Sequence, residues 1–399
     1  MSLAVVLILI RLKLPNGLAM SAGALVVTIA SGMDLAGIAR TAWDTLRSLQ
    51  TISILGTMLL VMALESLMTR YGLIDRLIAS LGKLIPDRRA HMMILPAFMG
   101  LLPSAGGALL SCPMVDKASD GSGMSPEQKA FTNFWFRHIM EFIAPVYTAL
   151  IILTQLTELP MASVLRPLLP MAAIATLAGL PVSFARARKA KPAARAKAAD
   201  EKAAGFRGAL KDLALSFAPI VVVLVLVIAF GLSPMVALLP VILALVVIFR
   251  PTAKDFKEMA VKVLNPGIIT MVLGIMFYKE ALSASGGISA LADAFTRLGL
   301  PMRAMIVALP FSVGLLTGMS SVTMALALPI LISMYGLGAM TPHVAALAYV
   351  GCNMGMNLTP THLCLVLTVG YFKVDLIKVI GMIFIPAMVT LAAALLILA

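Results

Sequence analysis

Long apolar stretches dominate this sequence and limit what it can fold into. Between Asp212 and Arg250, for example, residues 213–249 contain no charged side chain. A helix needs about 20 predominantly apolar residues to span a bilayer, and 61% of the 399 residues are hydrophobic. We therefore predict an all-α polytopic membrane protein. The expected crossings are 1–14, 17–32, 51–69, 127–157, 160–184, 209–231, 233–250, 264–284, 340–369 and 375–398.

The positive charge of the chain is concentrated in one polar segment. The net charge is +13 at pH 7, and residues 185–208 form an Ala/Lys/Arg-rich linker between two apolar halves. Cytoplasmic loops of membrane proteins carry an excess of Lys and Arg. We therefore expect a cytoplasmic linker, both termini outside, and a multi-pass location in the cytoplasmic membrane of a bacterium or archaeon. The linker is short and poor in aromatic residues, so nucleic acid is not an expected partner.

Each half also contains an apolar stretch that small residues interrupt in the middle. In residues 90–118 the interruption is PSAGG, and in residues 300–335 it is TGMSS. Proline and glycine disfavour helix continuation, and each arm is short for a crossing. Both stretches predict a re-entrant helical hairpin whose tip brings polar groups to the membrane centre. The tip residues expected to bind substrate or ion are Ser104, Ala105, Gly106, Gly107, Thr317, Gly318, Ser320 and Ser321.

The two halves of the chain match in sequence pattern. The motif Pro-x3-Gly-Leu-Leu occurs at residues 96–102 and again at residues 310–316. We expect residues 1–184 and 209–399 to be two copies of one unit, each with about five transmembrane helices and one hairpin. Because five crossings is an odd number, the second copy must be inverted relative to the first. Inverted repeats with interrupted helices are typical of secondary transporters, whose site lies near the bilayer midplane.

Two predicted helices, 127–157 and 340–369, carry polar and ionisable residues in their middle. Each also contains a proline there, and a proline inside a helix removes a hydrogen bond and frees a nearby carbonyl. Ionisable side chains within a membrane are costly and by default indicate function. The candidate site residues are Arg137, His138, Glu141 and Pro145 in the first helix, and Asn353, Asn357, Thr359, Pro360, Thr361 and His362 in the second.

Several of these residues have a structural interpretation beside the functional one. Arg137 and Glu141 are four positions apart and share one face of a continuous helix. They form either a structural pair or a site in which Arg137 or His138 faces an anion and Glu141 carries the coupling proton or cation. His362 is either a core histidine bonded to a carbonyl or a site residue, and the hairpin tips are either binding loops or kinks that ease helix packing. Asn353, Asn357 and Thr359 offer neutral oxygens for Na⁺. No firm metal-binding motif accompanies them.

Two motifs in these regions carry a family resemblance. Residues 100–115, GLLPSAGGALLSCPMV, and residues 357–368, NLTPTHLCLVLT, resemble an uncharacterised branch of the ion-transporter superfamily, the family called domain of unknown function 401. The resemblance covers nearly the whole chain. It implies an elevator-type carrier and a homodimer, in which the tips and the interrupted helices hold substrate and coupling ion. Relatives with a Ser-Asn-Thr sodium signature at both tips differ from this chain, which has PSAGG and TGMSS there.

The sequence therefore predicts a secondary active transporter for a small organic anion, expected to be a carboxylate, in symport with H⁺ or Na⁺. A cation/proton antiporter in which Glu141 exchanges its load is the first alternative. An intramembrane enzyme is disfavoured because no nucleophile–base set recurs, and a channel because the repeats indicate alternating access around one site. The expected partners are the anion, the lipid bilayer and a second copy of the chain. No cofactor besides the coupling ion is expected.

Overall fold

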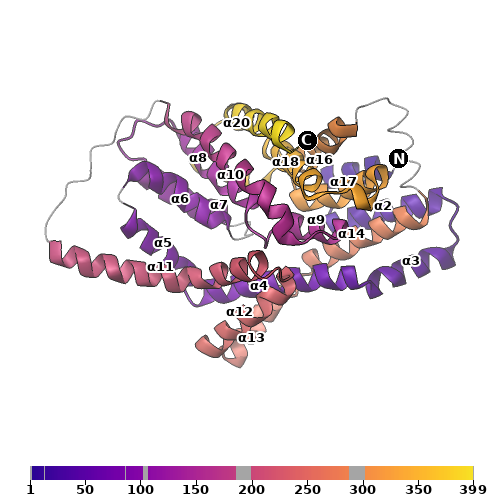
Figure 1. The fold of residues 1–399 in the computed structure, drawn as a ribbon, viewed down its shortest axis with the longest axis horizontal. Helices are drawn as coiled ribbons and strands as arrows, with labels where there is room; N and C mark the ends of the chain where they lie inside the picture. The colour runs from indigo at the N-terminus through magenta and orange to yellow at the C-terminus, as the bar shows by residue number, and fades with distance from the viewer. Residues whose placement is uncertain are drawn as a thin grey trace.

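The computed structural model describes residues 2–12, 14–85, 87–101, 107–185, 199–286 and 302–398. Within these ranges every regular element is a helix (Figure 1), which confirms the predicted all-α class. Three predicted features lie wholly or partly outside the described residues. They are the first hairpin tip at Ser104, Ala105 and Gly106, most of the linker, and the start of the second hairpin.

Apolar helices and shorter amphipathic helices follow one another along both halves. The first half contains α1 (Ser2–Arg11), α2 (Asn16–Ala30), α3 (Leu35–Arg47), α4 (Leu49–Arg70), α5 (Leu73–Leu84), α6 (Arg88–Gly100), α7 (Gly107–Ala118), α8 (Pro126–Ile139), η1 (Met140–Phe142), α9 (Thr148–Thr157) and α10 (Met161–Phe184). The second half contains α11 (Ala199–Ile228), α12 (Pro234–Phe249), α13 (Ala253–Val263), α14 (Pro266–Ala284), α16 (Met302–Thr317), α17 (Ser320–Tyr335), η2 (Leu337–Ala339), α18 (Pro342–Asn357), α19 (Leu363–Phe372) and α20 (Leu376–Ile397).

Five helical segments of the described chain are long and apolar enough to cross a membrane, so this is a multi-pass membrane protein. They are Leu49–Arg70, Met161–Phe184, Phe206–Ile228, Ala253–Ala284 and Leu376–Ile397. The other expected crossings contain shorter helices, and residues 1–14 hold only the ten-residue α1. Three helices, α3, α5 and α13, lie outside the predicted crossings and hairpins. All three are amphipathic and α13 buries no residue, so a search for continuous apolar stretches misses them.

Matching sequence signals begin the two interrupted helices. The Ser125 hydroxyl accepts a hydrogen bond from the backbone amide of Gln128, and Pro126 is the first residue of α8. The Thr341 hydroxyl caps α18 in the same way, again with a proline in the first turn. Polar N-caps followed by proline are strong helix-start signals, because proline lacks the N–H that would be left unpaired there.

The helices form two packed groups. In one group α2 packs on α14, α5 on α11, and α4 on both α12 and α13. In the other group α6 packs on α8, α16 on α18, α9 on α17, and α10 on α20. In Figure 1, α3, α4 and α11 form a row across the lower part of the molecule, with α12 and α13 below it, whereas α8, α10, α18 and α20 lie above this row. Each group therefore combines helices from both halves of the sequence.

Glycines let the hairpin arms approach the interrupted helices closely. A Cβ atom added at Gly100 would lie 2.1 Å from the carbonyl oxygen of Arg137. One added at Gly314 would lie 2.7 Å from the carbonyl oxygen of Cys352. Both distances are far shorter than a non-bonded contact of about 3.5 Å. The α6 and α8 backbones are thus in direct contact, as are those of α16 and α18.

Candidate functional site

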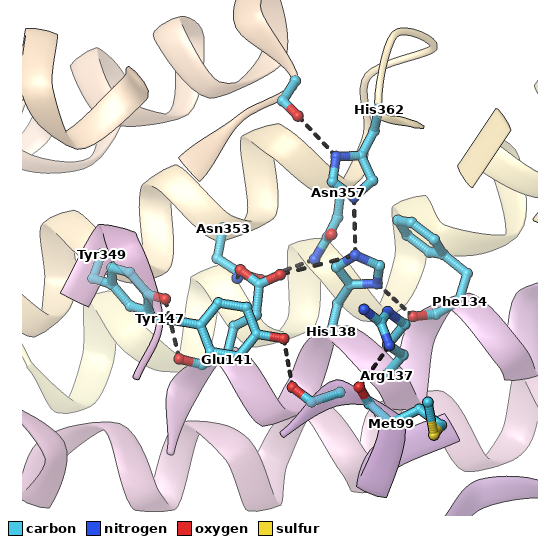
Figure 2. Close-up of polar contacts among 12 residues, drawn as sticks. Met99, Phe134, Arg137, His138, Glu141, Tyr147, Tyr349, Asn353, Asn357 and His362 are labelled. Carbon is cyan, nitrogen blue, oxygen red and sulfur yellow. Dashed lines mark hydrogen bonds and ion pairs between the residues drawn. The ribbon is translucent and has the colours of Figure 1, made fainter. Parts of the chain in front are cut away.

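Both interrupted helices break where their polar residues are concentrated. In the first helix, α8 continues into η1, which ends at Phe142, and α9 begins at Thr148. In the second, residues 358–362 separate α18 from α19. Pro145 and Pro360 lie in these gaps, where neither can donate a backbone hydrogen bond. Side chains beside the two gaps point toward one another and form one buried polar cluster (Figure 2).

Two histidines from opposite halves of the chain meet in this cluster. Nε2 of His138 lies 2.9 Å from Nε2 of His362. Nδ1 of His138 lies 2.7 Å from the carbonyl oxygen of Phe134, one turn earlier in α8. Nδ1 of His362 lies 2.8 Å from the carbonyl oxygen of Gly318, at the tip between α16 and α17. The two imidazoles therefore connect the first gap, the second gap and the second hairpin tip (Figure 2).

A carboxylate and two carboxamides continue the cluster toward α18. The Glu141 carboxylate lies 3.8 Å from Nε2 of His138 and accepts a 3.1 Å hydrogen bond from Nδ2 of Asn353. Oδ1 of Asn353 in turn accepts a 2.9 Å bond from Nδ2 of Asn357. Oδ1 of Asn357 is buried and accepts no hydrogen bond within the described part of the chain. Buried acceptors of this kind are rare in proteins and call for an explanation, such as a ligand.

Arg137 and Glu141 have different partners, in contrast to the pair suggested by their spacing. The Arg137 guanidinium donates a 2.6 Å hydrogen bond to the carbonyl oxygen of Met99 in α6 (Figure 2). The Glu141 carboxylate faces His138 and Asn353 instead. The expected pair assumes a continuous α-helix, but α8 ends at Ile139 and a 3₁₀ turn follows. That tighter turn changes the direction of the Glu141 side chain.

The tip between α16 and α17 packs against the second gap. Gly318 has a φ angle of +69°, a conformation that glycine adopts without strain. The Thr317 hydroxyl lies 3.1 Å from a threonine hydroxyl in α17, the helix that begins at Ser320. Oγ1 of Thr359 lies 3.0 Å from Oγ1 of Thr361 in the gap, and a Cβ at Gly318 would lie 2.9 Å from the Thr361 hydroxyl. The tip thus contacts the gap directly.

Other predicted site residues lie away from the central cluster. Pro360 and Thr361 are exposed. Pro145 lines a small apolar cavity beside α4 and α11. The Ser321 hydroxyl contacts the sulfur of a methionine on α14, and Gly107 is the first residue of α7. The structure therefore assigns the closest contacts to the histidines, Glu141 and the two asparagines.

Three residues outside the predicted site set contribute to the cluster. Tyr349 donates a 3.0 Å hydrogen bond to the Glu141 carbonyl oxygen, and Tyr147 donates one to the carbonyl oxygen of Gly100. The sulfur of Cys364 lies within 4.8 Å of a ring nitrogen of each histidine. Tyr349 lies one helical turn before Asn353, so a helical-face analysis identifies it.

The polar cluster is buried within the part of the chain that the structure describes. A pocket of about 590 Å³ opens between α4, α9, α14 and α17, with Gln50, Gln155 and Lys279 among its polar lining residues. No residue of the cluster at the two gaps belongs to that lining. Arg137, His138 and Glu141 are each no more than 5% exposed. A ligand at the cluster would therefore be shielded from water on all the sides that the described residues cover.

Comparisons with known proteins identify the fold and the family. A search of curated proteins finds no match. Among solved structures, the crystal structure of the Alcanivorax borkumensis YdaH transporter, reported to have an unusual topology, has a TM-score of 0.62 and 16% sequence identity. The match covers 92% of this chain and 88% of that one, so the chain shares the fold of a membrane transporter. A family model described as "Protein of unknown function (DUF401)" matches residues 1–399, and the chain belongs to this family.

Proposed function

We propose that the protein is a secondary active transporter that carries a small organic anion, a carboxylate, in symport with H⁺ or Na⁺. The observation that carries the proposal is the buried polar cluster at the two helix gaps. It lies inside an apolar multi-pass chain that shares a transporter fold. Ionisable side chains at membrane depth are costly to bury and are typical of substrate and ion pathways.

The charge of the cluster favours an anionic substrate. Arg137 is 3% exposed and always protonated, so it supplies a permanent positive charge beside the first gap. Its planar guanidinium matches the geometry of a carboxylate better than an ammonium group does. The buried acceptor oxygen of Asn357 suits either a donor group on the substrate or a Na⁺ ion.

Matching contacts in the two halves support the proposed internal repeat. Gly100 meets the backbone of Arg137 in the first half, and Gly314 meets the backbone of Cys352 in the second. The partners in the second half are 214 and 215 positions later than those in the first. Inverted repeats with interrupted helices around a central site are a common design of secondary transporters. The protein accordingly fits the ion-transporter superfamily.

The two helix groups support an elevator mechanism. α6 to α10 and α16 to α20 hold the cluster and pack mainly on one another. α2, α4, α5 and α11 to α14 form the other group, which would serve as the scaffold and as the interface of a homodimer. The first group would then carry the substrate across the cytoplasmic membrane as one body, with alternating access on the two sides.

A thermal-shift screen tests the proposal. Purified protein is heated with a panel of mono-, di- and tricarboxylates, with and without Na⁺ and over a range of pH. A ligand that binds only the folded state stabilises it by about 2.7 kcal/mol at a hundredfold excess over Kd. We expect at least one carboxylate to raise the melting temperature. Arg137→Gln should abolish the shift, and Arg166→Gln, on the exposed surface of α10, should retain it.

Two outcomes would count against carboxylate binding at this cluster. If no carboxylate changes the melting temperature but pH and cations do, the cation/proton antiporter is the better description. If Arg137→Gln responds to the carboxylate as the wild type does, the anion binds elsewhere. Should Arg137→Gln fail to fold, Asn357→Leu tests the same cluster, because it removes the buried acceptor oxygen and keeps the number and branching of the side-chain heavy atoms.

A further inference from the structure

We propose that His138 and His362 hold one shared proton between their Nε2 atoms, and that this proton is the coupling ion. The transport role rests on the proposed function, whereas the proton site itself follows from the geometry of the two imidazoles. The site joins the two halves of the chain and the second hairpin tip. The proposed ligand is H⁺, and the proposed binding atoms are the two Nε2 atoms.

The number of protons follows from three contacts. Nδ1 of His138 lies 2.7 Å from the Phe134 carbonyl oxygen, and Nδ1 of His362 lies 2.8 Å from the Gly318 carbonyl oxygen. A carbonyl oxygen only accepts, so each Nδ1 must carry a hydrogen at these distances. The two Nε2 atoms are 2.9 Å apart, which also requires a hydrogen between them. Four ring nitrogens thus hold three hydrogens, and the pair carries one positive charge.

The surroundings offset the cost of burying this charge. An isolated buried cation is strongly disfavoured, but a charge that is hydrogen-bonded and paired is tolerated. The Glu141 carboxylate lies 3.8 Å from Nε2 of His138 and provides the counter-charge. Arg137 on α8 and the Cys364 thiol on α19 are the other charged or titratable groups that face the pair. With Glu141 ionised, the histidine pair and Glu141 are neutral together.

Loss of the shared proton would change the structure of the site. Two neutral imidazoles that keep their carbonyl contacts would point lone pairs at each other across 2.9 Å. This arrangement is repulsive, so either the rings separate or one carbonyl contact breaks. Because one of those carbonyls belongs to Gly318, deprotonation would release the second hairpin tip from the gap. Proton binding is thereby linked to the position of a tip expected to bind substrate or ion.

Nitrogen-15 NMR tests the proton site directly, because it counts the protonated ring nitrogens of the histidine pair. The chain contains four histidines, and the other two are His91 and the exposed His343. Replacing these two by Gln leaves only the pair, and nitrogen-15 shifts distinguish protonated from unprotonated ring nitrogens. We expect three protonated nitrogens and one unprotonated nitrogen per pair near neutral pH. Two protonated nitrogens would overturn the proposal, and so would four.

A transport measurement then tests the coupling role. The number of protons moved per anion is measured in proteoliposomes for wild type, His362→Gln and the control His343→Gln. We expect the ratio to fall toward zero in His362→Gln and to be unchanged in His343→Gln. An unchanged ratio in His362→Gln overturns coupling through the pair. If the wild type moves no anion at all, the proposed function fails, whereas the NMR count still decides whether the proton site exists.

Metal binding is the competing explanation, and Co²⁺ is the probe for it. Co²⁺ is added to the full-length wild-type protein and to the Cys364→Ser variant, and visible absorption is recorded. Absorption that appears in the wild type and is lost in the variant would indicate a metal ion bound by the two histidines and Cys364. That result would overturn the shared proton, because the metal would occupy both Nε2 lone pairs. Absence of the absorption in protein that gives the three-proton NMR pattern supports the proton site.

Discussion

The close contact between α16 and α18 leaves no room for a side chain at Gly355. A Cβ atom there would lie 2.1 Å from the carbonyl oxygen of Phe311 and 2.8 Å from its carbonyl carbon. Since non-bonded carbon contacts need about 3.5 Å, Gly355→Ala must push the two helices apart by roughly 1 Å. Inserting one methyl group into a packed interior costs about 1–3 kcal/mol. We expect the upper end of that range, because two backbones must move and no flexible side chain can yield.

The matched control is Gly381→Ala in α20. A Cβ atom at Gly381 meets nothing within 4 Å, so alanine there should stabilise the helix by up to about 1 kcal/mol. Both variants are heated in detergent, and the fraction of intact protein is followed by size-exclusion chromatography. We expect Gly355→Ala to melt at least roughly 5 °C below the wild type, and Gly381→Ala to melt at or above it. Equal melting of the two variants would refute the direct backbone contact between α16 and α18.

Three further predictions concern the cluster and the topology. Glu141→Ala removes the counter-charge of the histidine pair and should cost several kcal/mol, roughly 3–5, whereas Arg137→Ala leaves the Met99 carbonyl oxygen without its donor and should cost about 1–3 kcal/mol. The double variant should not recover stability, because the two side chains have different partners; recovery in thermal melts would indicate that they form an ion pair. Tyr349→Phe leaves the Glu141 carbonyl without its donor and should cost about 1–3 kcal/mol; a melt that matches the wild type contradicts this. Cysteines introduced into the 185–208 linker should resist impermeant reagents in intact cells, and labelling from outside would contradict the predicted topology.

The all-helical fold and the two helix gaps were accessible from sequence because their signals are local. Proline at 145 and at 360 lies among polar residues in otherwise apolar stretches, and both stretches are divided in the structure. The interruption TGMSS likewise separates α16 from α17. Amphipathic α3 and α13 were missed because their apolar residues cover only one face and do not form a continuous stretch.

The partners within the cluster were beyond the reach of local patterns. His138 and His362 are 224 positions apart and meet only because two gaps pack together. The i, i+4 spacing of Arg137 and Glu141 suggests a pair on a continuous helix, and the 3₁₀ turn after Ile139 removes that geometry. Side-chain partners in a membrane site depend on tertiary packing, and a single sequence does not specify it.

The glycine contacts also affect how the protein responds to its bilayer. Backbones that touch leave no space for a lipid chain and no compressible layer of side chains between α6 and α8, or between α16 and α18. A thicker or thinner membrane therefore cannot be accommodated by sliding within either pair. Each helix pair must instead tilt as one rigid body, as transmembrane helices do under hydrophobic mismatch. Transport rate should thus depend on the acyl-chain length of the surrounding lipid.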